Sequence, residues 1–236
     1  MSKNSFQFKQ FTVYQERCAM KVGTDGTLLG AWANAPEGPS SILDIGTGTG
    51  LVALMMAQRF PEATIHGIDI DTEAVAQATE NVARSPFASR IMINRCDATK
   101  ITDMEGYDAI VCNPPYFMDA LTCPEAQRTM ARHATTLNYK SLAKIAKKLL
   151  KPHAVLSVVI PVEYEENIES AVTFEGLFVN RVCQIKTTPN KLPKRLLMEI
   201  RKQPVDAIDF TEQVLEISPG IRSDWYHELT KDFYIK

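Results

Sequence analysis

The sequence predicts an α/β protein whose mostly parallel sheet is covered by helices on both faces. Short apolar runs alternate with longer segments that carry apolar residues at helical spacing, which is the pattern of strands joined by crossover helices. The chain has 236 residues, of which 45% are hydrophobic and 23% charged, so it is long enough to bury a large core. We expect one domain with a smaller element attached to it.

Five short apolar runs are predicted to be the parallel strands: residues 41–45, 63–69, 90–96, 107–112 and 154–160. Four longer segments are predicted to be helices: residues 51–60, 71–85, 139–151 and 163–176. The strands are rich in Ile, Val and Leu, as is typical of strands that are buried on both faces. The last helix ends at Gly176, a residue that is common directly after helices.

Both ends of the chain lie outside this alternation. Residues 177–187 and 194–202 are predicted to be two strands that form an antiparallel hairpin around the turn TPNKLP. Residues 1–35 are predicted to be an N-terminal extension that packs on the core domain, residues 36–236. The extension contains a strand or hairpin in FQFKQFTVYQ and a capped helix in TDGTLLGAWAN.

Composition excludes several classes of protein. The 28 acidic and 26 basic residues give a formal charge of −2, so a positive field over the whole surface is excluded. The five cysteines show no CxxC spacing and the histidines are scattered, which indicates reduced thiols and no metal site. No apolar run is long enough to cross a bilayer, and the N-terminus has no signal-peptide core. We therefore expect a cytoplasmic monomer without membrane contact.

A glycine-rich turn, Asp44-Ile-Gly46-Thr-Gly48-Thr-Gly50, joins the first strand of the alternation to the helix that follows. Glycines there let the backbone approach a ligand, and the helix N-terminus supplies free amide groups. Gly48, Gly50 and Ala53 fit the dinucleotide pattern GxGxxA, whereas Asp44 before three glycines fits S-adenosylmethionine. A carboxylate suits the cationic methionine end of S-adenosylmethionine and would repel a pyrophosphate, which favours the second ligand. A tight turn without a ligand is the remaining alternative.

Two further carboxylates follow the next two strands. Asp69 ends the second strand and is predicted to accept hydrogen bonds from both ribose hydroxyls. Its alternative role is the N-cap of the helix that starts near Asp71, which could itself supply that cap. Asp97 follows the third strand and is predicted to accept a hydrogen bond from an adenine amino group, the alternative being a solvated loop acid.

The segment Asn113-Pro114-Pro115-Tyr116 directly follows the fourth strand. Its prolines fix φ and remove two N–H donors, so the segment is rigid and presents carbonyls. The side-chain oxygen of Asn113 and the carbonyl of Pro114 are predicted to converge on one planar NH₂ group and to direct its lone pair at an electrophilic methyl. Tyr116 is predicted to stack on a base. An extended turn with an aromatic plug is the alternative.

Residues 44–50 and 113–116 together resemble the class I S-adenosylmethionine-dependent methyltransferases that modify planar NH₂ groups. Residues 8–33, 113–117 and 131–137 resemble, more narrowly, the bacterial tRNA (adenine-N6) methyltransferases that act on adenine 37 beside the anticodon of a valine tRNA. This resemblance implies a seven-stranded Rossmann-like methyltransferase sheet. It also implies S-adenosyl-L-methionine as the methyl donor and a tRNA anticodon loop as the partner.

The same resemblance implies which residues hold the donor. The implied contacts are Lys21, Thr24, Asp25, Asp44, Gly46, Asp69, Asp97 and Asn113. Without the resemblance, the segment Thr24-Asp25-Gly26 is explained equally well as a helix N-cap.

Basic residues are expected to place the RNA by its phosphates, without reading its sequence. In residues 186–202 we expect RNA contact, with Lys194 and Arg195 apart from the donor site. Arg128 and Arg132 lie closer in sequence to the reacting base, whereas the lysines of residues 140–151 are expected to form a solvated helix face.

Three other functions stay open on the sequence alone. The same chemistry could act on guanine N2 of ribosomal RNA or on a protein glutamine. The GxGxxA pattern could serve a nicotinamide oxidoreductase, and a binding module could hold the donor without turnover. Trp225 and Tyr226, near the C-terminus, are expected to be a packing anchor rather than a base-stacking pair.

Overall fold

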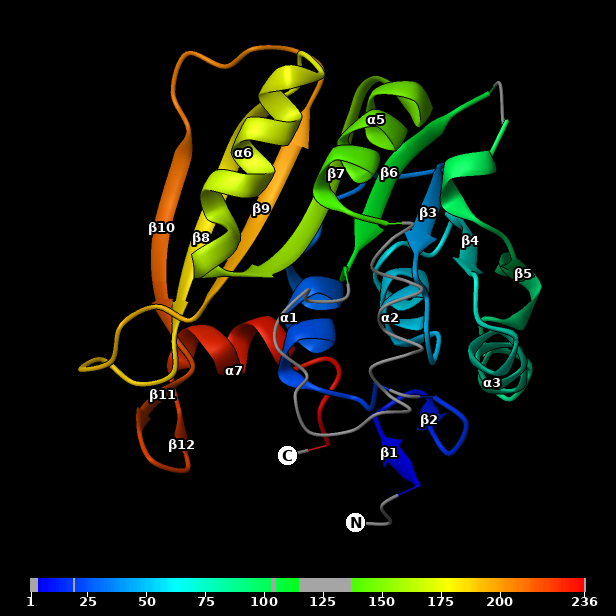
Figure 1. Cartoon of the computed structure of the whole chain (residues 1–236). Coiled ribbons are helices and arrows are strands. Elements are labelled where there is room, and N and C mark those ends of the chain that lie inside the picture. Colours follow the sequence, from blue (N-terminus) through cyan, green and yellow to red (C-terminus); the bar gives the residue numbers. More distant parts are fainter. Residues whose placement is uncertain (1–3, 19, 103–104, 115–136, 236) are drawn as a thin grey trace, which may run out of the picture.

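The structure, a computed structural model, describes residues 4–18, 20–102, 105–114 and 137–235. Its centre is an eight-stranded sheet (Figure 1). In spatial order the strands are β10 (Asp209–Val214), β8 (Phe178–Lys186), β9 (Arg195–Arg201), β7 (Leu150–Pro161), β6 (Tyr107–Cys112), β3 (Ser41–Ile45), β4 (Thr64–Asp69) and β5 (Ile91–Arg95). β9 pairs antiparallel with both of its neighbours and every other pairing in this sheet is parallel, so the predicted α/β class is confirmed.

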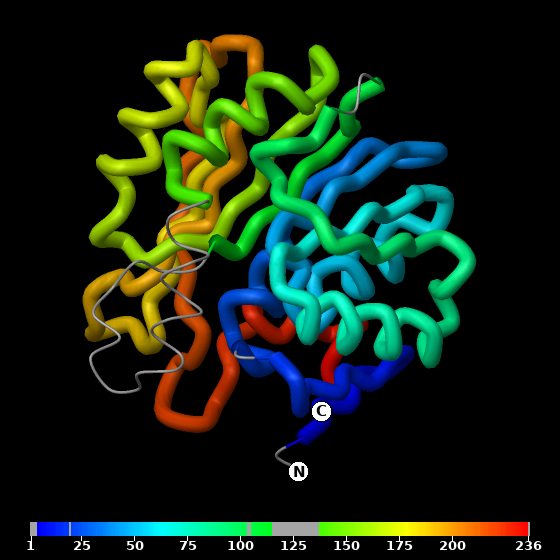
Figure 2. The backbone as a smooth tube through the Cα atoms, turned by 45° about the vertical axis from the view of Figure 1, so that its right-hand side comes forward, coloured from blue at the N-terminus to red at the C-terminus, as the bar shows by residue number. Residues whose placement is uncertain are grey.

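Helices cover both faces of the sheet. They are α1 (Thr24–Trp32), α2 (Leu51–Arg59), α3 (Thr72–Ala83), α5 (Tyr139–Leu149), α6 (Glu165–Phe174) and α7 (Asp224–Thr230), with short 3-10 turns at η1 (Ala88–Arg90), η2 (Ala98–Lys100) and η3 (Val162–Tyr164). Apolar residues of α1, α2 and α3 belong to the core on one face, and those of α5 and α6 to the core on the other. Figure 2 shows the two helical layers with the sheet between them.

The C-terminal segment adds elements that the sequence did not predict. The eighth strand, β10, extends the seven strands expected of the family by pairing with β8 at the edge of the sheet. Most of its residues are exposed, so no apolar run marked it in the sequence. A small hairpin of β11 (Glu216–Ser218) and β12 (Ile221–Arg222) precedes α7. Tyr226 of α7 is buried in the core, as expected of a packing anchor.

The N-terminal segment packs against the opposite end of the chain. β1 (Ser5–Gln7) and β2 (Thr12–Tyr14) form a hairpin, one of the two structures expected for this segment. The ring of Phe8 lies 4.8 Å from that of Phe11 and 5.9 Å from that of Tyr234, measured between centroids. The N–H of Lys9 donates to the carbonyl of Phe233 at 2.8 Å. Both termini therefore lie at the same end of the molecule (Figure 1).

One buried side chain ties the N-terminal hairpin to the core. Asn81 of α3 accepts a hydrogen bond from the N–H of Tyr14 at 2.9 Å and donates to the carbonyl of Tyr14 at 2.7 Å. It also donates to the carbonyl of Thr49, in the glycine-rich turn, at 2.8 Å. Because Asn81 is fully buried, these bonds are shielded from water. The chain that leaves β2 is thus anchored beside the glycine-rich turn.

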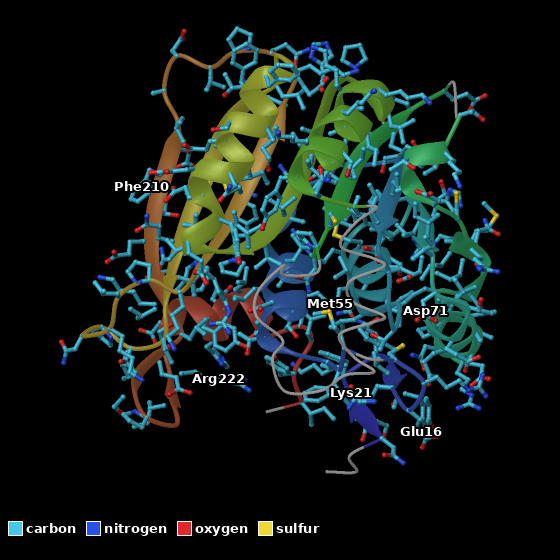
Figure 3. All side chains as sticks on the ribbon, viewed as in Figure 1. Glu16, Lys21, Met55, Asp71, Phe210 and Arg222 are labelled. Atoms are coloured by element: carbon cyan, nitrogen blue, oxygen red, sulfur yellow. The ribbon has the colours of Figure 1, made fainter. Side chains whose placement is uncertain are left out.

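Close packing of α1 on α2 makes Gly30 intolerant of a side chain. A Cβ at this position would lie 2.7 Å from Sδ and 2.8 Å from Cβ of Met55, which Figure 3 shows beside α1. We expect Gly30→Ala to lower the free energy of unfolding by about 1–3 kcal/mol through overpacking. Alanine favours the helix by about 1 kcal/mol relative to glycine, so helix propensity alone would make the variant more stable.

Urea unfolding measures the difference in the free energy of unfolding between Gly30→Ala and the parent protein. Gly26→Ala, on the same helix, is the control. At Gly26 an added Cβ would meet only the tip of Leu51, at 3.0 Å, and we expect a smaller loss. Equal stability of Gly30→Ala and the parent protein would contradict the close approach of the two helices.

Candidate active site

Three of the predicted segments meet at the carboxyl ends of neighbouring strands. The glycine-rich turn follows β3, Asp69 ends β4 and Asn113 follows β6, and these strands are adjacent in the order β6-β3-β4. Parallel strands bring such ends to one edge of the sheet, which is where open α/β sheets bind ligands.

The glycine turn, residues 46–50, is wound tightly above this edge. Gly46, Gly48 and Gly50 have φ angles of 71°, 55° and 81°, a region that residues with side chains rarely adopt. The N–H groups of Gly46 and Thr47 both donate to the carbonyl of Ile68 in β4 at 2.9 Å. The turn thus requires glycine for its shape and leaves the backbone open to a ligand.

Asp44 lies beneath the glycine turn and is almost fully buried. Its Oδ2 accepts hydrogen bonds from Oγ1 of Thr47 at 2.7 Å and from the N–H of Ala53 at 3.1 Å. Burial raises the pKa of Asp44 to about 7, with a smaller contribution from the charge of Asp69, against these two hydrogen bonds. Within the described ranges no Lys or Arg forms an ion pair with Asp44, so its ionised form favours a cationic ligand.

Asp69 connects the end of β4 to the glycine turn. Its Oδ2 accepts the N–H of Gly48 at 3.0 Å and its Oδ1 accepts the N–H of Asp71 at 2.9 Å. The N-cap of α3 is Asp71, whose Oδ1 accepts the N–H groups of Glu73 at 2.7 Å and Ala74 at 3.3 Å. The alternative in which Asp69 caps this helix is therefore wrong, and Asp69 stays available as a ligand-binding carboxylate.

A cavity of about 270 Å³ opens between the glycine turn and the start of α1. Seven predicted site residues line it: Lys21, Thr24, Asp25, Asp44, Gly46, Gly48 and Asn113. Eight further residues, none of them predicted to bind the donor individually, also line it: Met20, Gly23, Gly26, Thr47, Thr49, Leu51, Val52 and Arg195. Gly50, Asp69 and Asp97 are predicted site residues that lie outside this lining.

The start of α1 supplies the charged side of the cavity. Gly23 is the N-cap and makes no side-chain capping bond, so Thr24 and Asp25 lie within the first turn of the helix. The alternative in which Thr24 or Asp25 caps α1 is therefore wrong. Lys21 Nζ donates to the carbonyl of Gln15, and Arg195 Nε donates to the carboxylate of Asp25. Arg195 thus belongs to the cavity, which the sequence analysis did not predict.

Asp97 lies next to the cavity rather than in it. The N–H of Cys96 donates to the carbonyl of Asp69 at 2.9 Å, so the ends of β4 and β5 adjoin. Asp97 Oδ1 accepts the N–H of Thr99 at 3.0 Å and its hydroxyl at 2.7 Å. Asp97 therefore caps the η2 turn, and this local role is compatible with a further hydrogen bond from a ligand.

The structure describes two of the three predicted catalytic residues. Asn113 is partly exposed at the cavity, and Pro114 after it is buried. Tyr116, Arg128 and Arg132 lie outside the described residues.

Basic side chains around the turn between β8 and β9 differ in their contacts. Lys186 pairs with a carboxylate of β10 at 2.7 Å, and Arg195 pairs with Asp25. Lys191 and Lys194 are exposed, and the described part of the chain offers their side chains no partner. Only these two lysines fit the expectation of an RNA-facing surface that is separate from the donor site.

The described ranges contain no group of three His, Cys, Asp or Glu side chains arranged to hold a metal ion. The four cysteines among them are free thiols. No helix within those ranges combines the length and apolar character needed to cross a membrane.

Comparison with known proteins identifies relatives over the whole chain. The family model described as methyltransferase small domain matches residues 26–165, more than half of the sequence. Curated relatives named tRNA1(Val) (adenine(37)-N6)-methyltransferase include that of Parabacteroides distasonis, which is 44% identical over 100% of both chains. The relative from Phocaeicola vulgatus is 48% identical over 98% of this chain and 97% of its own. That from Bacteroides thetaiotaomicron is 45% identical over 100% and 99%.

Solved structures share the fold at much lower sequence identity. A protein from Agrobacterium tumefaciens described as a predicted O-methyltransferase has a TM-score of 0.69 and 17% identity, covering 89% of this chain and 96% of that one. An S-adenosylmethionine-dependent methyltransferase from Aquifex aeolicus has a TM-score of 0.53 and 16% identity, covering 71% and 84%. At these identities the likeness concerns the fold alone. On the evidence of its full-length relatives, the chain belongs to the tRNA1(Val) (adenine(37)-N6)-methyltransferase family of class I S-adenosylmethionine-dependent methyltransferases.

Proposed function

We propose that this protein transfers a methyl group from S-adenosylmethionine to the exocyclic N6 amine of adenine 37 in the anticodon loop of a valine tRNA. The full-length relatives carry this activity in their names. One structural observation carries the proposal: Asn113 and the glycine turn line the same cavity. An amine held by Asn113 would therefore face a methyl donor held by the turn.

The cavity fits S-adenosylmethionine chemically. The methionine end of S-adenosylmethionine carries an ammonium and a carboxylate. Asp44 and Asp25 in the cavity lining are opposite in charge to the ammonium, and Lys21 is opposite in charge to the carboxylate. The backbone of the glycine turn would contact the middle of the donor molecule. Asp69 would bind its ribose, and Asp97 would bind its adenine. When bound, the donor supplies an electrophilic methyl group on a positively charged sulfur.

The chain's own residues would act mainly by positioning. Asn113 Oδ1 and the Pro114 carbonyl each accept one N–H of the target amine, which frees its lone pair to face the methyl group. Tyr116 holds the adenine ring by stacking. The new N–C bond forms as the S–C bond breaks, and the amine then loses its extra proton to water. No strong base is needed, so orientation supplies most of the rate enhancement.

The position of Asp44 argues against a nicotinamide oxidoreductase. In a dinucleotide-binding fold the pyrophosphate lies on the turn and the helix N-terminus. Here the carboxylate of Asp44 lies beneath that turn and accepts a hydrogen bond from the N–H of Ala53, a residue of the competing GxGxxA pattern. The monomeric state and the cytoplasmic location stay predictions.

Nucleoside analysis tests the proposed function directly. The purified protein is incubated with labelled S-adenosylmethionine and total tRNA, and the RNA is digested to nucleosides. We expect the label in N6-methyladenosine, and its loss when adenine 37 of a valine-tRNA transcript is replaced by guanine. Parallel incubations replace the tRNA with ribosomal RNA or with a release-factor preparation. Label in N2-methylguanosine of the ribosomal RNA, or in the release-factor protein, would support the other amine substrates instead.

Asp69→Ala is expected to raise the KM for S-adenosylmethionine about ten- to hundredfold, because a charge-assisted hydrogen bond is worth about 1.5–3 kcal/mol. Part of this loss will come from the turn, since Asp69 also accepts the N–H of Gly48. Steady-state kinetics at saturating tRNA measures the effect. Asp71→Ala is the matched control: it removes the cap of α3 and should lower stability by about 1 kcal/mol with little change in KM. The reverse pattern would move the ribose contact to Asp71.

A further inference from the structure

Arg195 is held in a fixed orientation at the edge of the cavity. Its Nε donates to the carboxylate of Asp25, and the side chain is 27% exposed. In the described part of the chain, its two terminal nitrogens, Nη1 and Nη2, form no hydrogen bond or ion pair. A guanidinium that is fixed through Nε presents these two nitrogens as a planar fork, which matches the oxygens of a phosphate or carboxylate.

Arg222 is held at the end of the β11–β12 hairpin by two tyrosine rings. Its guanidinium carbon lies 4.4 Å from the ring centre of Tyr234 and 5.7 Å from that of Tyr226. Glu216 is its direct partner in the hairpin register, yet the carboxylate of Glu216 accepts the N–H of Gly220 at 3.1 Å. Among the residues that the structure describes, no carboxylate forms an ion pair with Arg222. These cation–π contacts hold its guanidinium beside the rings and leave the N–H groups for an anion.

The C-terminal segment brings the two arginines to one side of the cavity. The N–H of Glu216 donates to the carbonyl of Thr187 at 3.0 Å, which joins the hairpin to the turn that precedes Arg195. α7 packs on α1, the helix that carries the partner of Arg195. Burial raises the pKa of Tyr226, and the positive charges of Arg222 and Arg195 both oppose this rise.

We propose that Arg195 and Arg222 bind phosphates of the RNA strand that carries the target base. This inference rests on the proposed function and adds to it an RNA-binding site made by the C-terminal segment. Arg195 lines the cavity and Arg222 lies outside its lining, so the two would meet different phosphates of one strand. Figure 3 shows Arg222 and Lys21 at the same lower end of the molecule.

A phosphodiester strand fits this arrangement better than the carboxylate of the donor. The donor has one carboxylate, which cannot meet both an arginine of the cavity lining and one outside it. A strand that leaves the cavity carries a negative charge at every nucleotide and can meet both arginines in turn. The exposed Lys191 and Lys194, in the turn beside Arg195, extend the positive surface without ion pairs in the described chain.

Salt-dependent binding of a hairpin RNA tests the proposal. The probe is a synthetic hairpin with the anticodon stem and loop of a valine tRNA, and fluorescence anisotropy follows its binding to the full-length protein. We expect R195Q and R222Q each to weaken binding at least about fivefold, as for the loss of a charge-assisted contact. Each should also reduce the log–log salt slope by about 0.7. K144Q, an exposed lysine of α5, removes the same charge elsewhere and should bind like the parent protein.

Two further measurements are needed. One distinguishes the effect of the planar guanidinium of Arg195 from that of its charge, and the other distinguishes RNA binding from donor binding. R195K keeps the charge and loses the planar fork, so it should restore the salt slope and recover only part of the affinity. Calorimetry with S-adenosylhomocysteine should give the parent dissociation constant for R222Q. If R195Q and R222Q bind the hairpin as tightly as the parent, the proposal is overturned.

It is also overturned if R195Q loses only S-adenosylhomocysteine binding. In either case, methylation of tRNA by the parent protein leaves the proposed function standing. A parent protein that binds S-adenosylhomocysteine and does not methylate tRNA would overturn the proposed function itself, whatever the binding of the hairpin.

Discussion

Asn113→Ala is expected to lower kcat for tRNA methylation by at least about 10²-fold, the scale seen when one preorganised polar group is lost from a reacting centre. The reason is that Asn113 lines the cavity together with the glycine turn, and its side-chain oxygen is the acceptor proposed to hold the target amine. Single-turnover kinetics on a valine-tRNA transcript measures the effect on the chemical step. Affinity for S-adenosylhomocysteine and the melting temperature should stay close to those of the parent.

Tyr116 variants show whether orientation and stacking are separate contributions. Tyr116→Phe keeps the aromatic face and should cost little, whereas Tyr116→Ala should cost about 1–3 kcal/mol in kcat/KM because the base loses its stacking surface. Asn113→Ala should be worse than Tyr116→Ala, and both worse than Tyr116→Phe. If Asn113→Ala turned over tRNA at the parent rate, the amine-methyltransferase proposal would fail, and the glycine turn would require another ligand.

The sheet was predictable because its strands are buried. β3, β6 and β7 read as apolar runs in the sequence, and the helices between them show helical spacing. β10 was not predictable in the same way, since the sheet holds it by parallel backbone pairing with β8 while most of its side chains face water. Backbone hydrogen bonds leave no pattern in the sequence, whereas burial does.

The site was predictable where its residues are consecutive. The glycine turn and the Asn113 segment each stand directly after a strand, so their sequence positions already imply one edge of the sheet. The ion pair between Arg195 and Asp25 was not predictable, because 170 residues separate the partners and only the antiparallel course of β9 returns Arg195 to that edge. The basic residues of 186–202 instead predict that Arg195 lies in an RNA-facing turn apart from the donor site.

Asp44→Asn is expected to weaken S-adenosylhomocysteine binding about 10²-fold above neutral pH, as for a buried charge pair that loses one partner. The change keeps a side-chain oxygen that can accept the bonds from Thr47 and Ala53, so the turn should survive. It removes only the negative charge that we propose to pair with the ammonium of the ligand. Calorimetry measures the dissociation constant, and equal affinity of variant and parent would exclude a cation contact at Asp44.

The raised pKa of Asp44 determines how the stability of the protein and its affinity for the ligand change with pH. Its pKa of about 7 in the folded protein, against 3.8 for the free group, means that the folded state keeps this proton longer. The contribution of Asp44 to stability is therefore greatest below pH 3.8 and is lost as the pH rises through about 7. Asp44→Asn removes this loss, so the ligand-free variant should be more stable than the parent to urea above neutral pH.

Asp108→Asn is the control with the opposite sign. Burial tends to raise the pKa of Asp108, but hydrogen bonds and charge from Lys151, with hydrogen bonds from Ser41, outweigh it and lower the pKa. That variant should therefore lose stability at neutral pH. If the ammonium of the ligand lies beside Asp44, it holds this carboxylate ionised, so ligand binding to the parent below neutral pH must release a proton. The affinity should then fall about tenfold for each unit by which the pH is lowered. Calorimetry in two buffers of different ionisation enthalpy detects that proton. Asp44→Asn should release none, and a parent protein that also releases none would show that ligand binding does not change the protonation of Asp44.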